Sequence, residues 1–184
     1  MNIQAVTSTL IAHLNSLTGS QGKGLAITSK GGYFLLVFGE MAGGEYERVM
    51  IDDRIGEAYY IRLKTGVVNE SSQGNKRRGS CAATNQIQAQ CRLVAMSHRL
   101  SIVELADAFR TSLNSFKAPT IGSDPVRAGA SVRATQYDFA TIVLDETPES
   151  ERDQVSGWEG AMQIIAIDFD LTYISESCPV TVEC

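Results

Sequence analysis

Histidine is scarce in this sequence. There are two histidines, His13 and His98, and neither lies near a serine, cysteine or carboxylate in an order that indicates a catalytic triad. Because most hydrolytic chemistry requires a general base, this scarcity disfavours hydrolytic enzymes. We expect a partly buried or capping role for each histidine. The sequence therefore predicts no catalytic residues.

Long apolar runs and paired cysteines are also lacking. No apolar stretch approaches the roughly 18 residues that cross a bilayer, and the first four residues show neither the basic start nor the apolar centre of a signal peptide. We therefore expect no membrane partner and a chain that is made and kept in a cytosol. The four cysteines form no Cys-x-x-Cys pair, so no zinc or redox pattern is present. A cytosolic compartment favours reduced thiols over a bridge between Cys178 and Cys184.

The composition is that of a soluble globular protein. The 184 residues are 43% hydrophobic and 20% charged, with a formal net charge of -5, which disfavours a general affinity for nucleic acid or anionic membranes. The length fits one domain with its own core. We expect that domain over residues 1–176, with a flexible loop at 65–84 and a C-terminal tail at 177–184.

Two amphipathic helices are predicted. Asn2 can cap the first, and Gly19 stands where a glycine would end it. Ser101 and Glu104 form a capping box at the start of the second, which should end before Pro119. The apolar residues of both recur at helical spacing, at Ile3, Val6, Leu10, Leu14 and Leu17 in the first and at Ile102, Leu105, Ala106, Phe109, Leu113 and Phe116 in the second.

Strands are predicted from alternation and from turn residues. The clearest alternating segment places Ile87, Ala89, Cys91, Leu93 and Ala95 on one face and Gln86, Gln88, Gln90 and Arg92 on the other. The closing strand, Ala161 to Glu176, alternates in the same way, with Ile165, Ile167, Phe169, Leu171 and Tyr173 on its buried face. Shorter strands are expected at Leu25 to Ser29, Tyr33 to Phe38, Tyr46 to Ile51 and Ala58 to Lys64.

A strand at Ser131 to Leu144 should form a long C-terminal β-hairpin with the closing strand. The predicted fold class is α+β: an antiparallel (mixed) β-sheet with two amphipathic helices packed on it and this hairpin at its end.

Two patterns suggest sites, and each has a simpler interpretation. The glycines Gly19, Gly22 and Gly24 could approach a phosphate, but they follow a helix and precede a strand, which is the wrong order for a nucleotide loop. Asp168 and Asp170, with the Asp52-Asp53 pair, could gather a divalent cation. The simpler interpretation is that Asp168 and Asp170 lie on the wet face of an antiparallel strand. The sequence predicts no metal and no cofactor.

The basic triplet Lys76, Arg77 and Arg78 lies in the polar loop. It could contact phosphate groups, although three cations in an acidic chain are a weak footprint for autonomous nucleic-acid binding. If the molecule forms a ring, the triplet is repeated in every subunit and could line a channel or meet an acidic neighbour surface that includes Glu149 and Glu151. A solvated loop is the alternative interpretation.

The order of elements resembles the tail-terminator and neck (head-to-tail connector) proteins of tailed bacteriophages. The likeness lies in residues 86–115 and 162–175: an alternating strand, the Ser101-capped helix, and a closing strand that ends in Asp170-Leu171-Thr172-Tyr173. It covers about half of the chain and includes no invariant motif. The loop at 65–84 and the tail are longer than the pattern requires.

The resemblance implies a non-enzymatic virion protein that forms a homo-oligomeric ring, with the subunits joined head to tail. It further implies portal or connector and tail proteins as partners, assembly in the host cytoplasm, and passage of DNA through the lumen without specific binding. The interface expected from it includes Lys76, Arg77, Arg78, Glu149, Glu151, Asp168 and Asp170. The rival hypotheses are a small metal-assisted enzyme that uses Asp168 and Asp170, and a nucleic-acid-binding module that uses the basic triplet.

Overall fold

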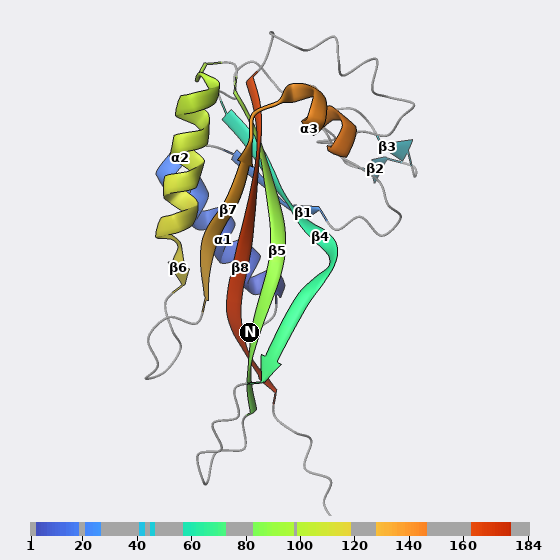
Figure 1. The fold of residues 1–184 in the computed structure, drawn as a ribbon, viewed down its shortest axis with the longest axis vertical. Helices are drawn as coiled ribbons and strands as arrows, with labels where there is room; N and C mark the ends of the chain where they lie inside the picture. Colours follow the sequence, from blue (N-terminus) through green and yellow to red (C-terminus); the bar gives the residue numbers. More distant parts are fainter. Residues whose placement is uncertain are drawn as a thin grey trace, which may run out of the picture.

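The computed structural model describes residues 3–18, 21–26, 41–42, 45–46, 57–72, 83–97, 99–118, 128–146 and 163–177. Helices and strands alternate irregularly along the chain (Figure 1). In chain order they are α1 (Ile3–Thr18), β1 (Gln21–Ala26), β2 (Met41–Ala42), β3 (Glu45–Tyr46), β4 (Glu57–Ser72), β5 (Ala83–Ser97), α2 (Ile102–Ser115), β6 (Lys117–Ala118), β7 (Ala128–Gln136), α3 (Phe139–Glu146) and β8 (Gln163–Ser177).

The main sheet has the strand order β1-β4-β5-β8-β7-β6. Its last five strands are antiparallel, and β1 joins the edge by pairing parallel to β4. At the centre, β5 and β8 pair without interruption from Ala83↔Ser177 to Ser97↔Gln163. The strands β2 and β3 form a separate antiparallel pair. The α+β class is thereby confirmed, with a mixed sheet that is antiparallel in five of its six strands.

Helices α1 and α2 cover one face of this sheet and form the main core with it. Both predicted helices are present, and the Ser101 capping box forms as expected. Tyr59 of β4 meets Phe109 of α2 edge to face, with ring centroids 5.2 Å apart. The expected strand faces are confirmed, because the buried cluster contains Ile87, Ala89, Cys91, Leu93 and Ala95 of β5 and Ile165, Ile167, Phe169, Leu171 and Tyr173 of β8.

Half-buried His13 joins the two helices, in agreement with the partly buried role expected for it. Its Nε2 lies 3.0 Å from the Ser112 carbonyl oxygen and 3.2 Å from the Ser115 hydroxyl. Because a carbonyl only accepts, Nε2 carries the proton and donates to it. Cys91 is a buried free thiol, and burial, with a smaller effect from Asp170, raises its pKa to about 12. It is therefore an inert part of the core.

The predicted strand from Ser131 to Leu144 is wrong in its second half. Strand β7 ends at Gln136, and residues Phe139–Glu146 form the third helix, α3. Asp138 starts this helix by accepting hydrogen bonds from the Ala140 backbone N–H (3.1 Å) and the Thr141 hydroxyl (2.6 Å). The long hairpin is therefore replaced by a short β7, paired with β8 from Ala128↔Tyr173 to Gln136↔Ala166, followed by a helix.

The expected loop at 65–84 is shorter than predicted. Strand β4 continues to Ser72 and β5 begins at Ala83. The register between them shifts between Leu63 and Val68, where β4 carries extra residues opposite β5. This bulge interrupts the alternation, which is why the strand pattern is weak there. The strand at Ala58 to Lys64 is confirmed as part of β4, and the one at Leu25 to Ser29 overlaps the end of β1. The strand at Tyr33 to Phe38 lies outside the described residues.

Candidate functional site

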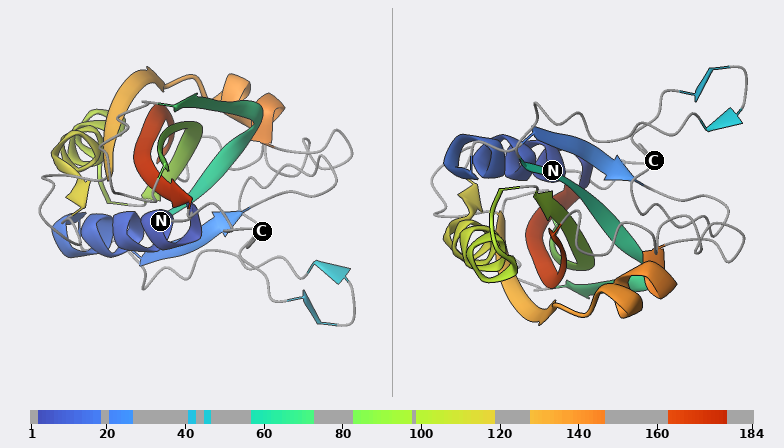
Figure 2. Two further views of the ribbon diagram at one scale, coloured as in Figure 1. Left: turned by 90° about the horizontal axis from the view of Figure 1, so that it is seen from below. Right: turned by 90° about the horizontal axis from the view of Figure 1, so that it is seen from above.

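The second face of the sheet, opposite α1 and α2, carries a cluster of charged side chains, several of them buried. Figure 2 shows α1 and α3 on opposite sides of β5 and β8. The expectation that this face is wet is wrong where α3 lies. There the face is buried, with Tyr60 on β4, Arg92, Val94 and Met96 on β5, and Ile164, Ala166 and Asp168 on β8. Helix α3 contributes Ile142, Val143 and Glu146 to the same layer.

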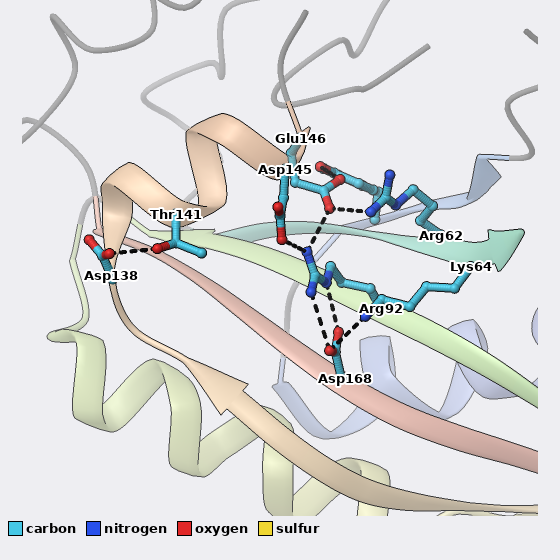
Figure 3. A network of polar contacts seen from close by, with 9 residues as sticks. Arg62, Lys64, Arg92, Asp138, Thr141, Asp145, Glu146 and Asp168 are labelled. Carbon is cyan, nitrogen blue, oxygen red and sulfur yellow. Dashed lines mark hydrogen bonds and ion pairs between the residues drawn. The ribbon is translucent and has the colours of Figure 1, made fainter. Parts of the chain in front are cut away.

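Arg92 is the centre of a charged cluster in this layer (Figure 3). Its side chain is 3% exposed. Nε donates to Asp168 Oδ1 at 2.7 Å and Nη2 donates to Asp168 Oδ2 at 3.2 Å, which is a bidentate pair. Nη1 donates to Asp145 Oδ2 at 2.7 Å and to Glu146 Oε1 at 3.2 Å. One guanidinium thus joins the β5–β8 ladder to the end of α3.

Glu146 is the deepest carboxylate of the cluster, with no exposed surface. Besides Arg92 it contacts Arg62 Nη2 at 2.7 Å and accepts a hydrogen bond from the Tyr60 hydroxyl at 3.0 Å. Lys64 completes the cluster by donating to Asp168 Oδ2 at 2.8 Å. Three cations therefore face three carboxylates, and this balance is what allows Arg92, Glu146 and Asp168 to be buried.

The pKa values follow from burial and pairing. Burial raises the pKa of Glu146 above its usual range, although Arg62 and Arg92 oppose this shift. Burial also acts on Asp168, but the hydrogen bonds from Arg92 and Lys64 outweigh it and lower the pKa of that carboxyl. The pKa of Tyr60 is raised, first by burial and then by Glu146. Tyr60 therefore acts as a hydroxyl donor to a carboxylate.

Of the residues considered for an interface or a metal site, the structure describes two. Asp168 is buried in the charged cluster, and Asp170, two residues further along β8, lies 3.5 Å from Arg133 Nη1. Because cations hold Asp168, its carboxylate is poorly suited to a metal ion. Among the described residues no group of three histidine, cysteine, aspartate or glutamate side chains could hold one.

The other predicted residues lie outside the part of the chain that the structure describes. They are Lys76, Arg77, Arg78, Glu149 and Glu151, together with Asp52, Asp53, His98, Cys81, Cys178 and Cys184.

Sequence reasoning missed Arg62, Lys64, Arg92, Asp145 and Glu146 as a cluster. One signal was present, because Val94 and Met96 follow Arg92 on the same face of the strand. A polar face that turns apolar within one strand indicates that something covers it. The sequence does not show what covers it, because the residues of α3 have the composition of a strand.

The cluster is suited to holding α3 on the sheet rather than to bond-breaking chemistry. Every charged group in it is engaged by an opposite charge, and it includes no serine, cysteine or histidine. No helix of the described residues is long and apolar enough to cross a membrane. No protein-family model and no curated protein matches this sequence.

Proposed function

We propose that this protein is a non-enzymatic structural subunit that forms a ring in the neck or tail-end region of a tailed bacteriophage and joins the head portal to the tail. Three elements support this likeness. The alternating strand, the capped helix and the closing strand that resemble the connector proteins correspond to β5, α2 and β8. On this proposal the protein belongs to the virion, is assembled in the host cytoplasm, and lets DNA pass through its lumen without specific binding.

The observation that carries the proposal is a three-stranded extension of the sheet, which we call the distal ribbon. It consists of residues 68–72 of β4, 83–89 of β5 and 171–177 of β8. At the lower end of Figure 1 these strands run on past α1 and α2. Strand β1 accompanies β4 only as far as Arg62, and β7 accompanies β8 only as far as Tyr173.

The outer edge of β4 at residues 68–72 and the outer edge of β8 at residues 174–177 therefore have no partner among the described strands. Unpaired backbone N–H and C=O groups on a sheet edge invite pairing with another chain, and proteins cover or blunt such edges. A ring of identical subunits buries them by a head-to-tail contact that closes on itself. The ribbon thus supplies the kind of surface that ring assembly requires.

The first test is the mass of the purified protein over a concentration series by light scattering. We expect one ring-sized species, or a monomer that assembles when a portal or tail partner is added. A concentration-independent monomer or dimer that engages no such partner contradicts the proposal. In that case salt-dependent binding through Lys76 to Arg78 would favour the nucleic-acid module, and activity lost in Asp168→Asn would favour the enzyme.

Edge substitutions locate the contact. Ser71→Lys and Ser175→Lys each put a charge on an edge of the distal ribbon, which is how natural proteins block strand addition. We expect both to reduce the ring fraction while the helical circular dichroism signal stays unchanged. Thr111→Lys on the exposed side of α2 is the matched control. Equal effects of all three lysines would show that the ribbon edges are not the interface.

A further inference from the structure

The two ends of the main sheet are irregular. At one end, β1 pairs with β4 through a register shift between Gly22 and Leu25. At the other end, β7 pairs with β8 through a register shift between Val132 and Ala134. Bulges of this kind bend and twist a strand, and they are one of the means by which proteins keep a sheet edge from pairing with another chain. Both ends of the main sheet are therefore blunted.

Strand β7 has two further features that protect its edge. The Val132 backbone N–H donates to Asn114 Oδ1 of α2 at 3.3 Å, so a side chain of the same chain already occupies this donor. Arg133, the extra residue of the bulge, is 41% exposed and brings a charge to the edge strand. The β7 edge is therefore poorly suited to receive a further strand.

The strands of the distal ribbon, as far as the structure describes them, pair without such shifts. Residues 68–72 of β4 pair with β5 in one continuous register, and β5 and β8 pair in one register along their whole length. A regular strand presents its backbone N–H and C=O groups in a repeating pattern, which suits pairing with another regular strand. The outer edges of β4 at residues 68–72 and of β8 at residues 174–177 are thus regular and open.

These two edges run in the same direction. Strand β4 is antiparallel to β5, and β5 is antiparallel to β8, so β4 and β8 are parallel to each other. They also lie at the same level, because Ser72 and Ser175 both pair with Asn85. Rotation about an axis along the strands preserves direction and level, and it brings the β8 edge of one subunit to the β4 edge of the next. This contact joins two different edges and can be repeated around a ring.

A two-fold axis across the strands would give a different contact. It would reverse the strand direction and join two identical edges in antiparallel orientation, β4 to β4 or β8 to β8. Such an isologous contact closes at the dimer and forms no ring. The proposed ring therefore requires the parallel contact between different edges.

The helices decide which face of the ribbon can lie toward the ring axis. Ile87 and Tyr173 of the ribbon belong to the core that α1 and α2 cover. A helix layer is about 10 Å thick, so it fits best on the outside of a closed barrel, where the circumference is larger. On the second face of the ribbon, Gln88 lies opposite Thr172. Helix α3 covers this second face further along the strands, around Arg92 (Figure 2).

We propose that residues 174–177 of β8 pair in parallel with residues 68–72 of β4 in a second copy of this chain, and that the ribbons of all subunits form one closed barrel with the second face of the sheet toward the axis. This inference rests on the proposed ring and names the strands that join it. Gln88 and Thr172 then line the lumen. Uncharged side chains offer no fixed cation to a phosphate, which suits DNA that passes without specific binding.

Mixing two blocked variants tests whether different edges pair. Ser71→Lys blocks the β4 edge and leaves the β8 edge open, whereas Ser175→Lys does the reverse. Under the conditions in which the wild type assembles, each variant alone should stay monomeric. Their mixture should give a dimer by light scattering, which cannot grow because both of its outer edges are blocked. Thr111→Lys on the exposed side of α2 is the control and should form the wild-type ring.

The outcomes separate this inference from the proposed function. A dimer of either blocked variant alone would mean that identical edges pair about a two-fold axis, which overturns the inference. A mixture that stays monomeric while the wild type forms its ring also overturns it, and the proposed function then stands with another interface. A wild-type chain that never assembles, with or without a portal or tail partner, overturns the proposed function and this inference with it.

Thiol labelling tests which face lines the lumen. Gln88→Cys should react with a bulky polyethylene-glycol maleimide in the monomeric Ser71→Lys background and should be protected in the ring. Thr111→Cys is the matched control and should react in both states, because it lies on the exposed side of α2. Equal labelling of Gln88→Cys in ring and monomer would show that this face does not line the lumen. Buried Cys91 is kept. The other native cysteines, Cys81, Cys178 and Cys184, are replaced by serine.

Discussion

Arg92→Met isolates the contribution of the charged cluster to stability. Methionine keeps much of the length and apolar volume of arginine, so the change removes the guanidinium with little loss of packing. Three carboxylates then lose hydrogen bonds of 2.7 to 3.2 Å: Asp168, Asp145 and Glu146. Asp145 is 43% exposed and can turn to water, whereas Glu146 is fully buried and Asp168 nearly so. The cost therefore comes mainly from the two buried carboxylates.

The expected loss is about 3 to 5 kcal/mol, the range for breaking a buried ion pair by removing one partner. Arg62 and Lys64 remain beside Glu146 and Asp168, which favours the lower half of that range. For a chain of this size the loss corresponds to a fall in Tm of about 6 to 20 °C. The assay is urea unfolding followed by far-UV circular dichroism, with the midpoint and slope fitted separately.

The matched control is Arg133→Met. Arg133 is 41% exposed and lies 3.5 Å from Asp170, so its loss should cost about 1 kcal/mol at most. If Arg92→Met costs no more than Arg133→Met, the cluster does not hold α3 and the reasoning is refuted. An Arg92→Lys variant should recover part of the stability, because one charge returns without the bidentate geometry.

Three more substitutions have expected outcomes, one of them in the charged cluster and two in and around α2. The pKa of Asp168 is lowered, so its stabilising effect is present above the ordinary pKa of about 3.9 and is lost as the pH falls through the lower pKa of the folded state. The Tm difference between wild type and Asp168→Asn should therefore shrink below about pH 3.9. An exposed Thr111→Ala control should show no such trend. Ser101 caps α2 by accepting from the Glu104 backbone N–H at 3.3 Å, so Ser101→Ala should cost about 1 kcal/mol in urea unfolding, and an unchanged midpoint would show that the cap is dispensable. Phe109 is 1% exposed in the main core, so Phe109→Ala should cost about 3 to 5 kcal/mol; a loss below about 1 kcal/mol would mean that the core refills the space.

Much of the fold could be predicted because it rests on local patterns. The stripe of α1, the capping box of α2 and the alternation from Ile87 to Ala95 each satisfy a periodicity that neighbouring residues determine. The buried faces of β5 and β8 followed from the same rule and are confirmed. Their pairing along the full length of both strands is a tertiary fact, which the alternation permits and does not require.

Helix α3 and the cluster beneath it could not be predicted from local pattern. Thr141, Ile142 and Val143 favour a strand by propensity, and that preference led to the wrong prediction. In the fold, Ile142, Val143 and Glu146 are buried against the second face of the sheet as part of a helix. Tertiary packing decides the conformation of a short segment whose own preference is weak.

The spacing of neighbouring residues specifies the two long helices and the central strands. It also specifies the apolar face on which they meet, so for these elements the order of amino acids is enough. The burial of Arg92 and Asp168, which alternation places on a wet face, arises only in the folded chain. These two residues can be buried because the fold places Arg62 and Lys64 of β4 and Glu146 of α3 beside them, and the opposite charges balance. Burying an unpaired charge costs too much free energy, so a buried charge needs an opposite charge beside it. Which residue supplies that charge depends on the whole fold.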